Sequence, residues 1–265
     1  MKYLAISLFV FSCNFLQAQN KTLFEASEGT KSGTYAETIE FYSTLAKLFP
    51  AISIFEIGET DSGFPLHVVI FDPQYKSQKR TEKAFEKNGK NLLLINNGIH
   101  PGEPDGIDAT MLLFRDFAEN KIPIPKNTII ATIPIYNIGG ALNRNSTSRT
   151  NQNGPEEYGF RGNARNYDLN RDFIKSDSKN AHAFAEIFHW LNLDLLIDNH
   201  VSNGADYQYV LTHLFTQHNK MGGELGDYLH TSFMPQLEDS LQLKKWDITP
   251  YVNVFNQVPE IGFTQ

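Results

Sequence analysis

Residues 92–103 read Leu92-Leu-Leu-Ile-Asn-Asn-Gly-Ile-His-Pro-Gly-Glu103, an apolar run that ends at two ionisable side chains. A second apolar run, Leu193-Asp-Leu-Leu-Ile-Asp-Asn-His200, ends at another histidine. Short apolar runs bounded by turn residues are typical of buried strands, so each run is predicted to be a strand followed by a loop. If the two strands lie side by side, His100, Glu103 and His200 meet at one end of a sheet.

These three side chains are candidate ligands for Zn²⁺. Two imidazoles and one carboxylate form a three-residue ligand set that leaves the fourth coordination position open for water, as catalytic zinc sites do. A His and a Glu three residues apart at a strand-to-helix turn can reach one ion, and the distant His completes the set. The His-x-x-Glu pattern alone does not separate this interpretation from a turn histidine beside a surface glutamate.

A second block lies between the two halves of the candidate ligand set. It reads Gly159-Phe-Arg-Gly-Asn-Ala-Arg-Asn-Tyr-Asp-Leu-Asn-Arg-Asp-Phe173 and contains Asp168-Leu-Asn170-Arg171. With His100-x-x-Glu103 before it and His200 after it, the order of motifs resembles the zinc metallocarboxypeptidases, the carboxypeptidase A-like family. The resemblance runs from about Tyr35 to the end of the chain.

The resemblance implies that Asp168 supports His100 through the second ring nitrogen of the histidine, which fixes the orientation of a metal ligand. Taken alone, Asp168 could equally cap a turn. Asp198, two residues before His200, is another candidate for this supporting role, unless it points to the opposite side of its strand.

Three further residues are assigned to the substrate by the same resemblance. Asn170 and Arg171 resemble the pair that grips the free α-carboxylate of a peptide, and a planar guanidinium suits a carboxylate well. The alternative is a surface arginine that caps a helix. Arg161 aligns best with the arginine that stabilises the negative oxygen developing during hydrolysis. Arg165 and Arg149 are the alternatives for that role.

The general-base glutamate of the family is not evident in this chain. Relatives carry it on a late strand, whereas Glu260 is the only late acid in an apolar setting here, and Pro259 makes it a poor strand residue. We therefore expect a C-terminally truncated member, with the base and the substrate-covering tyrosine beyond Gln265. Such a fragment would bind zinc and hydrolyse little.

Composition narrows the class of protein further. The 265 residues carry a formal net charge of −7 and a pI near 5.6, which argues against nucleic acid or an anionic membrane as the main partner. The start of the chain, with Lys2, an apolar run and Ala18-Gln19, is typical of a secretory signal over residues 1–19. A buried N-terminal element is the alternative. Cys13 is the single cysteine and lies inside that segment, so the mature chain has no thiol or disulfide.

The remaining sequence predicts one catalytic domain over residues 35–265, after a polar linker over residues 20–34. The fold class is α/β, with a mixed parallel and antiparallel central sheet and helices on both faces, as strands alternating with helices and one hairpin indicate. The predicted helices cover residues 34–49, 105–117 and 178–191, a hairpin joins 51–58 to 64–71, further strands cover 128–136 and 207–212, and a mixed helical segment reaches about 241. The stretch 137–167 is predicted to be a long functional loop.

The favoured function is a secreted or periplasmic zinc exopeptidase that removes the C-terminal residue of peptides with a free carboxylate. An amidase or deacylase acting on γ-linked or N-acyl substrates, such as peptidoglycan-type peptides, would use the same metal and the same arginine. A catalytically inactive zinc-binding or peptide-binding module is the third possibility.

Overall fold

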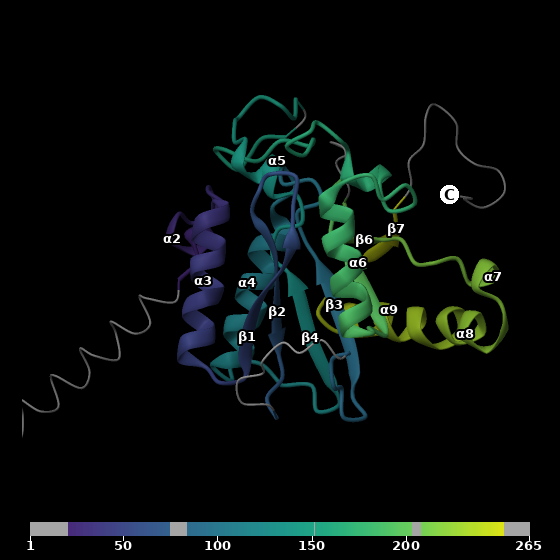
Figure 1. The fold of residues 1–265 in the computed structure, drawn as a ribbon. Helices are drawn as coiled ribbons and strands as arrows, with labels where there is room; N and C mark the ends of the chain where they lie inside the picture. The colour runs from purple at the N-terminus through teal and green to yellow at the C-terminus, as the bar shows by residue number, and fades with distance from the viewer. Residues whose placement is uncertain (1–20, 75–83, 151, 203–207, 252–265) are drawn as a thin grey trace, which may run out of the picture. The chain divides into compact units, whose positions relative to one another are not determined.

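The computed structural model describes residues 21–74, 84–150, 152–202 and 208–251 (Figure 1). The chain divides into two compact units, Met1–Asn203 and Gly204–Gln265. The predicted signal segment, with Cys13, and the candidate base Glu260 lie outside the described residues. The described part contains no helix long and apolar enough to cross a bilayer.

A five-stranded mixed sheet forms the centre of the first unit, as predicted. Its strand order is β1-β2-β4-β3-β5, in which β1 and β2 form the expected hairpin, β2 and β4 are antiparallel, and β4, β3 and β5 are parallel. The bounds are β1 Ile52–Glu59, β2 Pro65–Phe71, β3 Asn91–Asn96, β4 Thr128–Ile133 and β5 Leu195–Asp198. Strands β2 and β4 are apolar on both sides, which suits a sheet covered on both faces.

Helices cover both faces of this sheet (Figure 1), and ring contacts between helices and strands show which helix lies on which face. Phe71 of β2 stacks on Phe117 of α4 (Asp105–Ala118). Phe71 is paired with Ile52 of β1, so Phe55, three residues further along β1, points to the opposite face. There Phe55 meets Trp190 of α6 (Lys179–Leu191). Helix α3 (Tyr35–Leu48) packs beside α4 through the Tyr42–Phe114 ring contact.

The segment predicted to be a polar linker is instead folded onto the first unit. Thr22 begins the short helix α2 (Leu23–Ala26) with a capping box to Glu25, and the Thr22 side chain is buried. Glu25 pairs with Arg115 of α4, and Arg144 donates to the carbonyl oxygens of Ser32 and Gly33. Polar composition suggested a linker, but here the polar groups are used as caps and as acceptors for partly buried arginines.

Two shorter elements lie in the segment predicted to be a functional loop and in the block after it. Helix α5 (Ile138–Leu142) is capped by the Asn137 side chain, and the 3-10 turn η1 (Leu169–Arg171) is capped by Asp168. In the second unit, β6 (Leu211–His213) pairs in parallel with β7 (Ile248–Pro250). Between them run α7 (His218–Met221), α8 (Gly223–Tyr228), the π-helical turn η2 (Leu229–Phe233) and α9 (Met234–Gln242).

Candidate metal centre

The parallel pairing of β3 and β5 brings the two predicted ligand segments together. Asn96 at the end of β3 is in register with Asp198 at the end of β5. The carboxyl ends of parallel strands lie at the same edge of a sheet, so the loops after β3 and β5 emerge side by side. His100 belongs to the first loop and His200 to the second.

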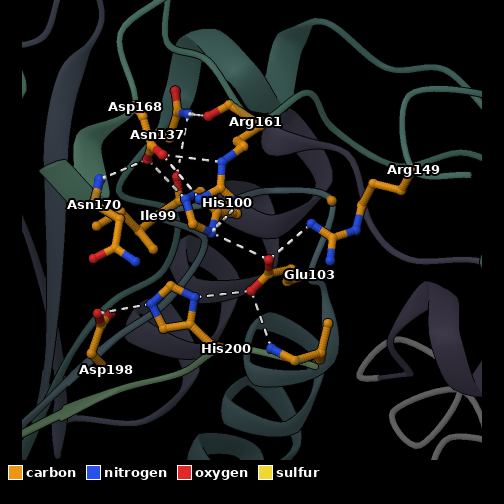
Figure 2. Close-up of polar contacts among 12 residues, drawn as sticks. Ile99, His100, Glu103, Asn137, Arg149, Arg161, Asp168, Asn170, Asp198 and His200 are labelled. Carbon is orange, nitrogen blue, oxygen red and sulfur yellow. Dashed lines mark hydrogen bonds and ion pairs between the residues drawn. The ribbon is translucent and has the colours of Figure 1, made fainter. Parts of the chain in front are cut away.

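The three predicted ligands converge on one point (Figure 2). His100 Nδ1 lies 3.2 Å from Glu103 Oε1, and His200 Nδ1 lies 2.9 Å from Glu103 Oε2. One ligand atom from each of the three residues lies within 4.8 Å of the other two. The turn between His100 and Glu103 is closed by the Glu103 N–H, which donates to the His100 carbonyl at 2.9 Å. This turn explains how residues three apart reach the same point.

A carboxylate holds the outer nitrogen of each histidine. Asp168 Oδ1 lies 3.0 Å from His100 Nε2, and Asp198 Oδ2 lies 3.1 Å from His200 Nε2. The side-chain amide of Asn96 donates to the other oxygen of Asp198 at 2.9 Å. Both aspartates considered from the sequence therefore contact a candidate ligand, each on a different histidine. This arrangement directs both Nδ1 atoms toward the shared point.

The electrostatics of the site favour a charged carboxylate at its centre. Burial alone would raise the pKa of the Glu103 carboxyl, but hydrogen bonds with His100 and His200 hold that pKa well below its usual range. Burial also opposes the charged form of His200, yet its contacts with Asp198 and Glu103 raise the pKa of His200 to about 9. A buried anion flanked by two imidazoles is a chemical environment that suits a divalent cation.

Two of the three candidate arginines reach the donor set, which comprises His100, Glu103 and His200. The Arg161 guanidinium donates twice to Asp168 Oδ2, at 3.1 and 2.9 Å, and its Nη1 lies 3.4 Å from His100 Nδ1. Arg149 Nη1 donates to Glu103 Oε1 at 2.8 Å. Arg165 instead lies over the Tyr167 ring, 4.4 Å from its centroid, and bonds the Tyr167 hydroxyl.

Asn170 and Arg171 form the 3-10 turn that follows Asp168. The Asp168 carboxylate accepts from the Asn170 N–H at 3.0 Å, so the residue that holds His100 also fixes the start of this turn. The Arg171 side chain is exposed and donates to the Asn170 carbonyl at 2.8 Å. Asn170 therefore lies beside the site, and the Arg171 guanidinium faces solvent next to it.

Some contacts of the site had no signal in the sequence. The Val201 N–H donates to Glu103 Oε2 at 3.1 Å, and Asn96 orients Asp198. Backbone donors leave no trace in residue type. The ion pair between Arg149 and Glu103 joins residues that are 46 positions apart, with no local pattern to connect them.

Comparison with known proteins shows the family and the fold of this chain. The profile of the zinc carboxypeptidase family matches residues 38–190, more than half of the chain. The chain is similar in structure to a metallo-carboxypeptidase from Burkholderia cenocepacia (18% identity, TM-score 0.56, covering 85% of this chain and 52% of that one). It is also similar to carboxypeptidase A from Helicoverpa armigera (14% identity, TM-score 0.56, covering 89% and 64%). A third similar structure is a metallo-carboxypeptidase from Pseudomonas aeruginosa in complex with (2-guanidinoethylmercapto)succinic acid (14% identity, TM-score 0.51, covering 83% and 52%). A comparison with curated protein sequences gave no match.

The α/β fold is that of the metallocarboxypeptidases to which the chain is similar. The chain belongs to the zinc carboxypeptidase family. It spans about half the length of several of the solved structures that it resembles.

Proposed function

We propose that this chain holds one Zn²⁺ through Nδ1 of His100, a carboxylate oxygen of Glu103 and Nδ1 of His200. We further propose that the protein to which it belongs is a secreted or periplasmic exopeptidase that hydrolyses the C-terminal peptide bond. The observation that carries this proposal is the convergence of the three ligand atoms within 4.8 Å. The chemistry of the donor set also fits, because both outer ring nitrogens are occupied by carboxylates and leave Nδ1 to face the ion.

When bound, zinc would supply a Lewis acid and lower the pKa of water toward about 7. The side chains around it have separate tasks. Arg161, close to His100 Nδ1, would stabilise the negative oxygen that develops on the scissile carbonyl. Asn170 and Arg171 would bind the terminal carboxylate and so present only the last peptide bond. The two aspartates that contact the donor set, Asp168 and Asp198, are committed to histidines, so neither is assigned as the general base.

Metal content tests the zinc assignment. We expect about one zinc per chain after purification and dialysis, and loss of that zinc in His100→Ala, because the remaining donors cannot hold it tightly. His182→Ala is the matched control, since His182 lies on the exposed side of α6 and contacts the Ser176 carbonyl. Wild-type protein that takes up no zinc would contradict the assignment.

Peptide trimming tests the exopeptidase assignment and is measured on the full-length gene product. Arg171→Ala should raise KM for free-acid peptides about tenfold or more, with a far smaller effect on C-terminally amidated peptides, because a charge-assisted bidentate contact is lost. Arg165→Ala removes another exposed guanidinium and should leave KM unchanged for both the free-acid and the amidated peptides. Equal effects of Arg171→Ala on both peptide types would count against the carboxylate clamp.

N-terminal sequencing of exported protein tests the predicted signal.

A further inference from the structure

Arg149 is a second guanidinium at the donor set for which the proposed function has no task. Its Nη1 donates to Glu103 Oε1 at 2.8 Å, and its side chain is 16% exposed. Arg161 already lies beside His100, and Asn170 with Arg171 lies on the turn after Asp168. Arg149 is therefore separate from both groups.

The position of Arg149 is fixed by its surroundings. The buried Tyr158 hydroxyl accepts from the Arg149 N–H and donates to the Arg149 carbonyl, each at 3.3 Å. Gln152 Nε2 donates to the Gly102 carbonyl at 2.9 Å, which ties the same loop to the ligand turn. A Cβ atom at Gly102 would lie only 2.7 Å from Arg149 Cδ. The Gly159 carbonyl oxygen would lie 2.8 Å from the same Cβ atom, so the arginine stem and this carbonyl together leave no room for a side chain at residue 102.

Arg149 and Asn170 lie on opposite sides of the donor set (Figure 2). In the proposed function, Asn170 and Arg171 bind the terminal carboxylate and the last peptide bond lies at the donor set. The residue upstream of that bond would then extend toward the side on which Arg149 lies, and its side chain would face this guanidinium.

Charge favours an anion at that place. Glu103 is contacted by His100, His200 and Arg149, so its negative charge is shared among several donors. A divalent cation held by Glu103 would stand next to Arg149, and the two positive charges repel each other. A carboxylate of the substrate beside Arg149 offsets that repulsion and gains a charge-assisted hydrogen bond.

We infer that Arg149 is a specificity residue that binds a carboxylate on the residue immediately upstream of the scissile bond. The inference rests on the proposed function, because that function sets the direction of the peptide. The carboxylate could be the side chain of an α-linked Asp or Glu, or the free α-carboxylate of a γ-linked Glu. Both sources present the same chemistry to the arginine.

Equilibrium binding to the zinc-loaded full chain tests the inference without relying on turnover. The probes are acetyl-Glu-Leu, its uncharged isostere acetyl-Gln-Leu, and acetyl-γ-Glu-Leu, measured by calorimetry. Wild type should bind acetyl-Glu-Leu or acetyl-γ-Glu-Leu about tenfold more tightly than acetyl-Gln-Leu, the size expected for one close charge pair. Arg149→Gln should reduce that ratio to about one. Tighter binding of either acidic peptide that depends on Arg149 supports the inference. The acidic peptide with the larger increase in affinity identifies the source of the carboxylate.

Two variants separate recognition from a loss of structure. Arg149→Lys keeps the positive charge and should retain part of the preference, whereas Arg165→Gln removes a charge outside the donor set and should retain all of it. The inference is overturned if wild type binds the acidic peptides no more tightly than acetyl-Gln-Leu. It is also overturned if Arg149→Gln keeps the tenfold preference for an acidic peptide. Amidated forms of the same peptides report on the proposed function: if free acids bind no better than amides, the carboxylate clamp itself is wrong. If wild type binds free acids better than amides but binds the acidic peptides and acetyl-Gln-Leu equally well, only the role of Arg149 is wrong.

Discussion

In each candidate ligand histidine, Nε2 contacts an aspartate carboxylate and Nδ1 faces the point that the three candidate ligands share. For His100 the outer partner is Asp168, and for His200 it is Asp198. An outer carboxylate fixes the tautomer and the ring orientation and makes the inner nitrogen a stronger base. Metal affinity at this site should therefore depend on side chains that never touch the ion.

Asp198→Asn tests this dependence at the histidine that comes from the second strand. We expect zinc affinity to fall about 10–100-fold, the usual loss for such a partner, because the amide is neutral and leaves His200 less firmly oriented. Competition with a fluorescent zinc chelator measures the change. Asp168→Asn should give a loss of similar size.

Asp194→Asn is the matched control for that measurement. Asp194 precedes β5 and pairs with Lys87 instead of a histidine, with Nζ 2.8 Å from Oδ2. The zinc affinity of Asp194→Asn should equal that of wild type. If Asp198→Asn also keeps wild-type affinity, the Asp198 contact does not support the metal site.

At the scale of elements, the N-terminal segment is held to α4 by a cluster of polar groups. Asp108 of α4 is buried, and Ser32 and Gly33 of the N-terminal segment interact with its carboxyl group. Burial raises the pKa of Asp108 from 3.8 to about 6, and the nearby Asp105 adds to the rise, while Ser32, Gly33 and Arg144 oppose it. The folded chain thus keeps a proton on Asp108 at a pH where the unfolded chain has released it.

This raised pKa gives a pH dependence with a definite sign. The folded form binds the Asp108 proton more tightly, so the stability contributed by this group is complete below about pH 4 and is lost as the pH rises through about 6. Asp108→Asn replaces the carboxylate with a neutral amide and so removes the free-energy cost of burying a negative charge in the folded state. Its free energy of unfolding should exceed that of wild type by about 1–2 kcal/mol at pH 8 and should differ little at pH 4.

Urea denaturation at the two pH values measures this difference. The exposed Glu40→Gln on α3 serves as the control for a general change in net charge, and it should shift stability little at either pH. A stabilisation of Asp108→Asn that is the same at pH 4 and pH 8 would mean that the charge of Asp108 is not its cause.

At the scale of the whole molecule, the elements that the sequence predicted well are those whose pattern is local. The apolar runs of β3 and β4, the β1–β2 hairpin and the helix after the ligand turn all follow from spacing and turn residues within a short window. The pairing of Asp168 with His100 came from a motif order that resembles a family. The convergence of His100, Glu103 and His200 then follows from parallel strands with a common edge.

The features that were not predicted depend on contacts between distant residues or on backbone groups. Polar composition predicts a linker before α3, whereas the spacing of Thr22 and Glu25 is that of a capping box and indicates the start of a helix. The structure follows the local capping signal and not the composition. The partnership of Arg115 with Glu25, or of Arg149 with Glu103, has no local signature, because only the completed fold brings these residues together.

The crowding around Gly102 has an evolutionary consequence. A Cβ atom at residue 102 would lie 2.7 Å from Arg149 Cδ and 2.8 Å from the backbone carbonyl oxygen of Gly159. The arginine stem can move aside, but the Gly159 carbonyl is part of the backbone, so a smaller residue at position 149 does not by itself make room. Homologues that keep this loop conformation are therefore expected to keep glycine at position 102, whichever residue they carry at position 149.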